Sequence, residues 1–144
     1  MPLWKLAAAA AAAVTLLLVG CGREDSQTAL ESAAQSLQDS IENKDNEELM
    51  AIIHPEFSAN QRLDRDWVQR TAAMMFLRHG NVGVIALNRQ SWIDPTYPDK
   101  GYSEAQLALT GAERWLPQRV GHYHVRLEWW REDGEWLLAR LNWE

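Results

Sequence analysis

The sequence predicts an α+β domain in which three helices come first and an antiparallel sheet follows. Apolar residues recur at helical spacing as far as His79, and apolar and polar residues alternate from Val82 onward. Near the C-terminus, Asp133-Gly134 lies between two alternating runs, which is typical of a β-hairpin. The chain has 144 residues, which is enough for a leader and one domain with its own core, but not for two domains.

The first 20 residues have the pattern of a leader. One basic residue, Lys5, comes before an apolar run over residues 6–19 that only Thr15 interrupts. The run is shorter than the roughly 20 residues that cross a bilayer as a helix. A short apolar stretch behind a basic start is typical of a secretory signal. We therefore expect a signal peptide over residues 1–20.

The only cysteine, Cys21, follows this leader directly. The stretch Leu18-Val19-Gly20-Cys21 resembles the lipobox of bacterial lipoproteins, in which the leader is cleaved before the cysteine. The thiol then takes a diacylglycerol and the new amine is usually acylated, with palmitate as the expected chain. The resemblance implies a membrane anchor at Cys21. Because Gly22 rather than aspartate comes next, it also implies the outer membrane, with the domain facing the periplasm.

A short tether over residues 21–25 is expected to join the lipidated cysteine to a domain over residues 26–144. The first helix of that domain is expected over residues 26–43. Asp25 and Ser26 are alternative caps for it. A capping box formed by Thr28 and Glu31 is the other alternative.

Two further helices are expected before the sheet. The second spans residues 47–53 and ends before Pro55, because the residue that precedes a proline avoids helical angles. The third runs from a cap at Asp64 or Asp66 to His79, where a Gly-Asn pair ends it.

The sheet is expected to contain four strands, and its last hairpin can be given a register. The expected strands are residues 82–93, 102–110, 121–130 and 135–143. A three-residue loop, Glu132-Asp133-Gly134, would pair Trp129 with Leu137 and place the apolar residues of both strands on one side. A two-residue turn would place them on opposite sides. We therefore predict the three-residue loop.

This register creates an unusual second face, with Trp130 opposite Trp136 and Arg126 opposite Arg140. Opposed arginines repel each other, and a tryptophan pair is costly to expose to water. Tryptophan and arginine are also enriched at binding hot spots. We predict that these four residues form a contact surface for a second copy or an envelope protein partner. The alternative is that a loop such as residues 94–101 covers the tryptophans within one chain.

Three short stretches connect the sequence to a known family. They are the break Asn43-Lys44-Asp45 between two helices, the helix exit His54-Pro55-Glu56-Phe57, and the terminal Gly134-Glu135-Trp136. With them the chain resembles the NTF2-like (SnoaL-like) superfamily over essentially its whole mature length. The resemblance implies a cone in which three N-terminal helices pack on a curved antiparallel sheet and enclose a pocket. Members include ketosteroid isomerases, dehydratases, polyketide cyclases, transport factors and lipoproteins of unknown role, so the fold does not choose a function.

By residue type, four side chains suit acid–base chemistry: Asp64, Asp66, Tyr102 and His54. The aspartates are better explained as helix caps and His54 as a helix end before proline. The isomerase pattern of a tyrosine and two pocket aspartates does not map onto this sequence, and no nucleophile elbow, phosphate loop or dinucleotide fingerprint is present. We therefore expect no catalytic residue and no cofactor. Binding of a ligand or partner is the preferred function, with a pocket enzyme of the isomerase or dehydratase type or a structural envelope subunit as alternatives.

A metal site is the remaining chemical possibility. His122 and His124 project to one side of a strand, and Glu144 adds a carboxylate, a combination that suits iron or zinc. Histidines on an exposed strand are more often polar surface, so we expect no metal. The net charge is −6 and no basic stripe is present, which excludes nucleic acid as a partner. The expected partners are the membrane, through the anchor, and a small apolar ligand.

Overall fold

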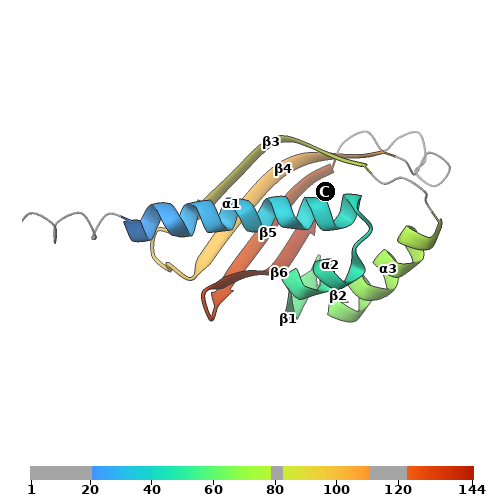
Figure 1. Ribbon diagram of the computed structural model, residues 1–144, viewed down its shortest axis with the longest axis horizontal. Coiled ribbons are helices and arrows are strands. Elements are labelled where there is room, and N and C mark those ends of the chain that lie inside the picture. Colours follow the sequence, from blue (N-terminus) through green and yellow to red (C-terminus); the bar gives the residue numbers. More distant parts are fainter. Residues whose placement is uncertain (1–20, 79–82, 111–122) are drawn as a thin grey trace, which may run out of the picture.

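The computed structural model describes residues 21–78, 83–110 and 123–144, which form three helices and a six-stranded sheet (Figure 1). The elements in chain order are α1 (Cys21–Glu42), α2 (Asn46–Ile52), β1 (Ile53–Ala59), β2 (Leu63–Asp64), α3 (Arg65–Arg78), β3 (Gly83–Ile93), β4 (Lys100–Thr110), β5 (Tyr123–Glu132) and β6 (Glu135–Trp143). The strands lie in the order β2-β1-β6-β5-β4-β3. Among the described residues, no helix is long and apolar enough to span a membrane.

The α+β class is confirmed, but the prediction of an all-antiparallel sheet is wrong. Strand β1 pairs parallel with β6, and neither β1 nor β2 was predicted. Pro55, which led us to expect only a helix end, lies within β1. It falls between Ile53 and Ser58, where the register of β1 against β6 shifts, so the missing N–H of the proline lies in the irregular part of this ladder.

The helices begin where side chains satisfy their first N–H groups, with one difference from expectation. Asp64, one of the two predicted caps, accepts the N–H of Trp67 at 2.9 Å and confirms the start of α3. Asp45 caps α2 by accepting the N–H of Glu48 at 3.0 Å. Helix α1 begins at Cys21 and not at residue 26, so the segment over residues 21–25, where we expected a tether, is helical. The predicted end of the third helix at His79 lies outside the described residues.

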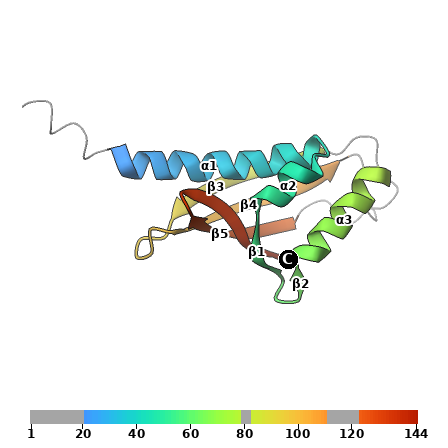
Figure 2. The same cartoon turned by 60° about the horizontal axis from the view of Figure 1, so that its bottom comes forward.

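Helix α1 lies along one face of the sheet, and α2 and α3 lie toward one end of it (Figure 2). The helix comes close to the sheet at Gly101, because a Cβ atom there would lie 2.7 Å from Cδ2 of the fully buried Leu30. Trp129 is also fully buried, and its indole N–H donates to Ser103 Oγ at 3.0 Å. The main core therefore fills the space between α1 and the inner face of the sheet.

The β5–β6 hairpin differs from the predicted register. Its turn has two residues, Asp133 and Gly134, both with positive φ (51° and 80°) and therefore of the kind that matches strand twist. Near the turn Trp129 pairs with Leu138, whereas farther away Leu127 pairs with Leu141. A β-bulge in β6 causes this shift, and it reconciles the tight turn with one apolar face.

The bulge also changes the predicted contact surface. Trp136 is only 5% exposed and belongs to the core, because near the turn the even residues of β6 face inward. Arg126 pairs with Asn142 and Arg140 with Glu128, so the two arginines are not opposed. The surface as predicted is therefore corrected: Trp136 leaves it, while Trp130, Arg126 and Arg140 remain on the outer face of the sheet. Whether these three bind a partner stays a prediction.

Candidate functional site

A cavity of about 310 Å³ lies between the helices and the inner face of the sheet. Its walls come from α1, α2 and α3 on one side and from β1, β4, β5 and β6 on the other. The lining side chains are Leu37, Ile41, Leu49, Ile53, Phe57, Trp67, Val68, Thr71, Ala72, Met75, Phe76, Leu107, Val125, Leu127, Leu138 and Leu141. The hydroxyl of Thr71 and the indole N–H of Trp67 are the only polar side-chain groups among them, and none of these side chains is ionisable.

The lining follows from the periodicity of each element. On α3, Val68, Ala72 and Met75 recur at three- and four-residue spacing and face the sheet. On β6, Leu138 and Leu141 are three residues apart and would face opposite sides of a regular strand. The bulge between them brings both into the cavity wall. The β-bulge in β6, which makes the register differ from the predicted one, therefore keeps the inner face apolar.

A second, smaller cavity of about 80 Å³ adjoins the first. Both are lined by the same five side chains, Leu37, Ile41, Leu107, Val125 and Leu127. The smaller cavity also reaches polar groups near the edge of the sheet, where Gln38 of α1 and Arg89 of β3 line it. The inner space therefore has a long apolar part and one polar end.

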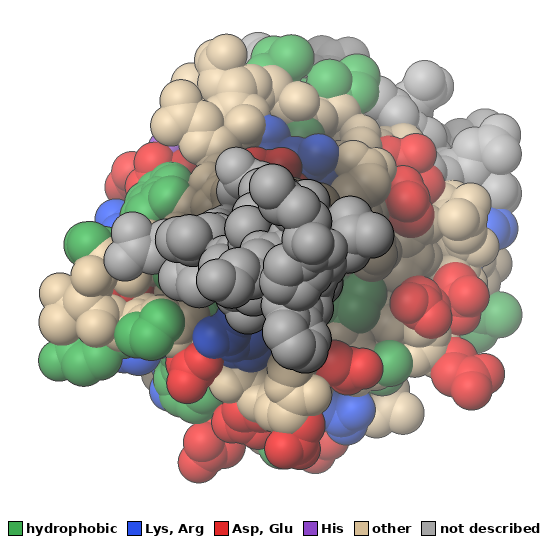
Figure 3. Space-filling view, turned by 60° about the vertical axis from the view of Figure 1, so that its left-hand side comes forward, with side chains coloured by type: hydrophobic (Ala, Val, Ile, Leu, Met, Phe, Trp, Pro, Cys, Tyr) green, Lys and Arg blue, Asp and Glu red, His purple; other side chains and the backbone are tan. Residues whose placement is uncertain are grey.

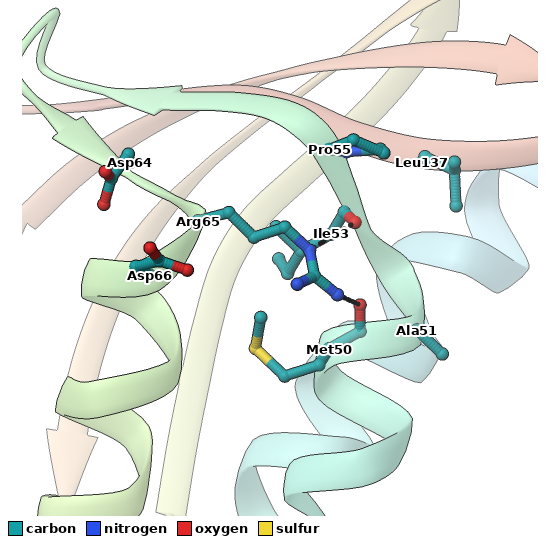
Figure 4. A pocket seen from close by; sticks show the side chains of 8 residues that line it. All are labelled: Met50, Ala51, Ile53, Pro55, Asp64, Arg65, Asp66 and Leu137. Atoms are coloured by element: carbon teal, nitrogen blue, oxygen red, sulfur yellow. Dashed lines mark hydrogen bonds between the residues drawn. The ribbon is translucent and has the colours of Figure 1, made fainter.

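On the outside, a hollow of about 580 Å³ lies where α2, β1 and α3 meet (Figure 4). Arg65 extends across it from the start of α3 and donates to the carbonyl oxygens of Met50 and Ile53, at 3.1 and 3.5 Å. These carbonyls end α2, so the arginine caps that helix. Asp64 and Asp66 also line the hollow. Asp64 is engaged as a helix cap and Arg65 bonds to backbone carbonyls. These two residues therefore connect α2 and α3 and do not form an acid–base pair.

His54 is buried, with 3% of its surface exposed, but it lies away from the cavity. Its Nδ1 accepts the N–H of Glu56 at 2.9 Å, so the ring proton is on Nε2, which donates to Glu132 at 2.7 Å. The ring also packs edge-on against Trp130, with centroids 4.9 Å apart. Both nitrogens are therefore occupied: Nε2 ties β1 to the end of β5, and Nδ1 bonds within β1.

Tyr102 lies on the outer face of the sheet, where its hydroxyl donates to Asp94 Oδ2 at 2.8 Å. The other carboxylate oxygen of Asp94 accepts the N–H groups of Tyr97 and Thr96. The N–H of Tyr97, followed by the N–H of Thr96 and the hydroxyl of Tyr102, lowers the pKa of Asp94 below its usual range. The bond to the carboxylate raises the pKa of Tyr102. This arrangement holds the β3–β4 loop and lies outside the cavity.

Two of the three candidate metal ligands, His124 and Glu144, lie among the described residues. His124 and Glu144 both line a shallow hollow at the end of the β5–β6 ladder, where their backbones pair. His122 lies outside the described residues. In the three described stretches no group of three histidine, cysteine, aspartate or glutamate side chains is placed to hold a metal ion.

Sequence reasoning found the chemically conspicuous residues, and the family resemblance implied a pocket, but the residues that line the cavity were not identified. The lining consists mainly of aliphatic and aromatic side chains. The helical and alternating patterns assign such residues to a core and do not show which of them border a cavity. Among the tryptophans of the apolar faces, Trp129 is fully buried. Trp67 and Trp143 are half-buried and stack on each other, with ring centroids 6.0 Å apart.

Comparison with known proteins identifies the fold alone. No protein-family model matches this sequence, and a search of curated proteins finds no relative. Among solved structures, an NTF2-like protein of unknown function from Pseudomonas putida has a TM-score of 0.68 at 10% identity, covering 84% of this chain and 87% of that one. A proposed dehydratase of the NTF2-like family from Streptomyces avermitilis has a TM-score of 0.65 at 14% identity, covering 83% and 95%.

A third similar structure belongs to a longer protein. Bd1075 of Bdellovibrio bacteriovorus matches with a TM-score of 0.67 at 11% identity over 79% of this chain, which spans only 38% of that protein. At these identities the likeness shows a common fold and nothing about activity. The described part of the chain therefore has the NTF2-like fold.

Proposed function

We propose that this protein binds a small apolar ligand in the inner cavity and does so without catalysis, as a lipid-anchored protein of the bacterial envelope. The observation that carries the proposal is the lining of the cavity, which has one hydroxyl and no ionisable side chain. A general acid or base has to reach the atom whose proton it moves. Asp64, Asp66, Tyr102 and His54 all lie outside this lining.

The size of the cavity favours a ligand over a packing defect. An engineered apolar cavity of about 150 Å³ stays dry and binds benzene, and pockets for small molecules begin at about 300 Å³. At about 310 Å³, the cavity is within that range. Because water gains few hydrogen bonds there, an apolar ligand that fills the space is favoured by roughly 25 cal/mol for each Å² of surface it buries.

The cavity can be tested by filling it. In a chain of residues 21–144 carrying Cys21→Ser, we expect the apolar fluorophore N-phenyl-1-naphthylamine to bind with enhanced emission. Ala72 lies on α3 with 9% of its surface exposed and lines the cavity. Ala72→Leu should weaken binding at least tenfold without lowering the melting temperature, since the added methyl groups occupy the ligand's space.

Ala73→Leu is the matched control for that test, because Ala73 is the next residue of α3 and lines neither cavity. It should leave the affinity unchanged. If Ala72→Leu binds the fluorophore as well as the wild type does, the inner cavity is not the binding site. A cavity variant that alters turnover of any substrate would favour the pocket enzyme instead.

The anchor is the second part of the proposal, with Cys21 as the lipidated residue and the periplasmic face of the outer membrane as the location. It rests on the lipobox-like sequence. Figure 3 looks onto the end of the molecule where α1 begins, and acidic side chains gather along the lower edge of this view. The exposed acids near this end include Asp99, Glu132 and Asp133. Acidic groups at this end disfavour electrostatic attachment to anionic lipid, which supports an acyl anchor as the means of attachment.

Mass spectrometry of the N-terminal peptide checks the anchor directly. The purified protein should begin at Cys21 and carry a diacylglycerol with an amide-linked acyl chain. Cys21→Ser should remain unlipidated and keep the leader. An unmodified Cys21 in the wild type would rule out the anchor but would leave the cavity proposal intact.

A further inference from the structure

A break in strand β3 turns one arginine toward the inner side of the sheet. The register of β3 against β4 shifts between Leu87 and Gln90, and Asn88 has a φ of 53°. Before the break the inward residues are Val84 and Ala86, which line the smaller cavity. Bulges of this kind redirect side chains and are enriched next to binding sites.

After the break the odd-numbered residues face inward. Ser91 bonds to the inward Ser103 through their hydroxyls, with the oxygens 2.8 Å apart. Arg89 is one of these odd-numbered residues after the break, and it lines the smaller cavity. In an unbroken strand Arg89 would share the outer side with Ile85 and Leu87. The bulge therefore places an exposed cation at the border of the smaller cavity, on the side of the sheet that faces α1.

Neutral groups hold this cation. The guanidinium of Arg89 donates to Oε1 of Gln35 at 2.9 Å and to Oε1 of Gln38 at 3.3 Å. The nearby acids of α1 are engaged by the amide nitrogens of the same glutamines, Asp39 by Gln35 and Glu42 by Gln38. Among the described residues no carboxylate forms an ion pair with Arg89.

The glutamines fix the orientation of the guanidinium without neutralising it. A guanidinium has five N–H donors in a planar fork. The two bonds to Gln35 and Gln38 leave other donors available. A fork of this kind matches a carboxylate, which can accept two parallel hydrogen bonds. A cation with free donors beside an apolar cavity suits a ligand that combines an anionic head with a hydrocarbon chain.

We propose that the ligand is a single-chain anionic amphiphile of the fatty-acid type. Its carboxylate binds Arg89 at the edge of the sheet, and its chain runs past Leu37, Leu107 and Leu127, which both cavities share, toward α3. Leu37 lies on α1 and the other two lie on the sheet, so the chain runs between the two layers that Figure 2 shows. This inference rests on the proposed function and adds the head group and the direction of the chain.

Photoaffinity labelling with two probes of equal chain length separates the head group from the chain. Protein purified from membranes is placed in phosphatidylcholine nanodiscs and labelled with diazirine derivatives of dodecanoate and of dodecanol. Labelling is measured by intact-protein mass spectrometry at increasing concentrations of unlabelled competitor. For Arg89→Gln we expect at least a tenfold weaker response to dodecanoate and an unchanged response to dodecanol.

Two further variants control for charge and folding. Arg89→Lys keeps the charge without the fork, so dodecanoate binding should be intermediate between wild type and Arg89→Gln. Arg70→Gln removes the same charge from an exposed position on α3 that lines neither cavity, and both probes should label it as they label the wild type.

The outcomes distinguish this inference from the proposal beneath it. Arg89 is not a head-group site if Arg89→Gln weakens labelling by both probes equally. The same holds if Arg70→Gln weakens dodecanoate labelling as much as Arg89→Gln does. Either result still leaves an apolar binding cavity. If neither probe labels the wild-type protein above an unrelated nanodisc protein, the proposed function fails and this inference fails with it.

Discussion

The two faces of the sheet differ in whether their side chains are already engaged, which the amino-acid types alone do not show. The outer face carries a histidine, a tyrosine, a half-buried tryptophan and several charged groups, and each of these groups already has a partner. Arg140 lies over Trp130 at 4.7 Å and donates to the carbonyl of Glu56, and Arg126 lies 3.6 Å from Glu104. The inner face offers no such chemistry, yet it borders unfilled space.

The two faces therefore differ more in whether their polar side chains already have hydrogen-bond or ionic partners than in which residue types they carry. A polar side chain engaged within the chain has to give up that bond before it can act on a ligand, whereas an empty apolar cavity gains by being filled. Sites inferred from residue type point to the outer face. The structure places the available binding capacity on the inner face and at Arg89 on its border.

The largest effect that separates the two faces is expected from two tryptophans of the same hairpin. Trp136→Ala removes a side chain that is 5% exposed in the core and should lower the free energy of unfolding by about 3–5 kcal/mol. Trp130→Ala removes contacts with Arg140 and His54 on the outer face and should cost no more than about 2 kcal/mol. Urea unfolding followed by circular dichroism measures both.

Sedimentation of the same two variants extends this comparison to the predicted contact surface. If the wild type is a dimer that Trp130→Ala dissociates while the fold survives, the outer face binds a second copy. Equal losses of stability for the two tryptophans would mean that the outer face is as much a core as the inner one, and the contrast would be wrong.

A smaller effect is expected at Asp94, where the outer face holds a loop by hydrogen bonds. Because the folded-state pKa of Asp94 lies below its unfolded value, the carboxylate stabilises the loop above the unfolded pKa, and this contribution is lost as the pH falls through the folded pKa. Tyr102→Phe removes one of the three donors, so the pKa of Asp94 should rise toward its usual range. Titration of the Asp94 carboxyl by NMR measures the change. An identical titration curve in both proteins would show that the tyrosine does not hold the loop through this carboxylate.

Local signals in the sequence were sufficient to place the three helices, apart from the start of α1, and insufficient for the sheet. Asp64 caps α3 through its own side chain, and such a cap can be recognised within four residues. Strand β1 was missed because Pro55 is a strong local signal against regular structure, and only the irregular ladder to β6 accommodates it. Helix caps are thus short-range features, whereas this strand depends on a partner far along the chain.

Two bulges account for the rest of the difference. The shift in β6 reversed the predicted facing of Trp136, and the shift in β3 turned Arg89 inward. Neither bulge contains a glycine. Nothing in the sequence around Ala139 or Asn88 indicates that the alternation of inward and outward residues stops there. The position of a bulge depends on what the strand packs against, so the alternation of the sequence does not predict which side chains face inward beyond it. The family resemblance implied a pocket, but its lining and volume could not be predicted for the same reason, because they depend on where α3 lies above the sheet.

The uninterrupted start of α1 has a consequence for how far the protein reaches. The helix begins at Cys21, and Leu37, which lines both cavities, lies on the same helix. At about 1.5 Å per residue, Leu37 is roughly 24 Å along the axis from that cysteine. If Cys21 carries the proposed anchor, α1 is a stiff spacer between bilayer and cavity. With α1 extending away from the bilayer, a lipid-derived ligand would have to leave the membrane before it is bound.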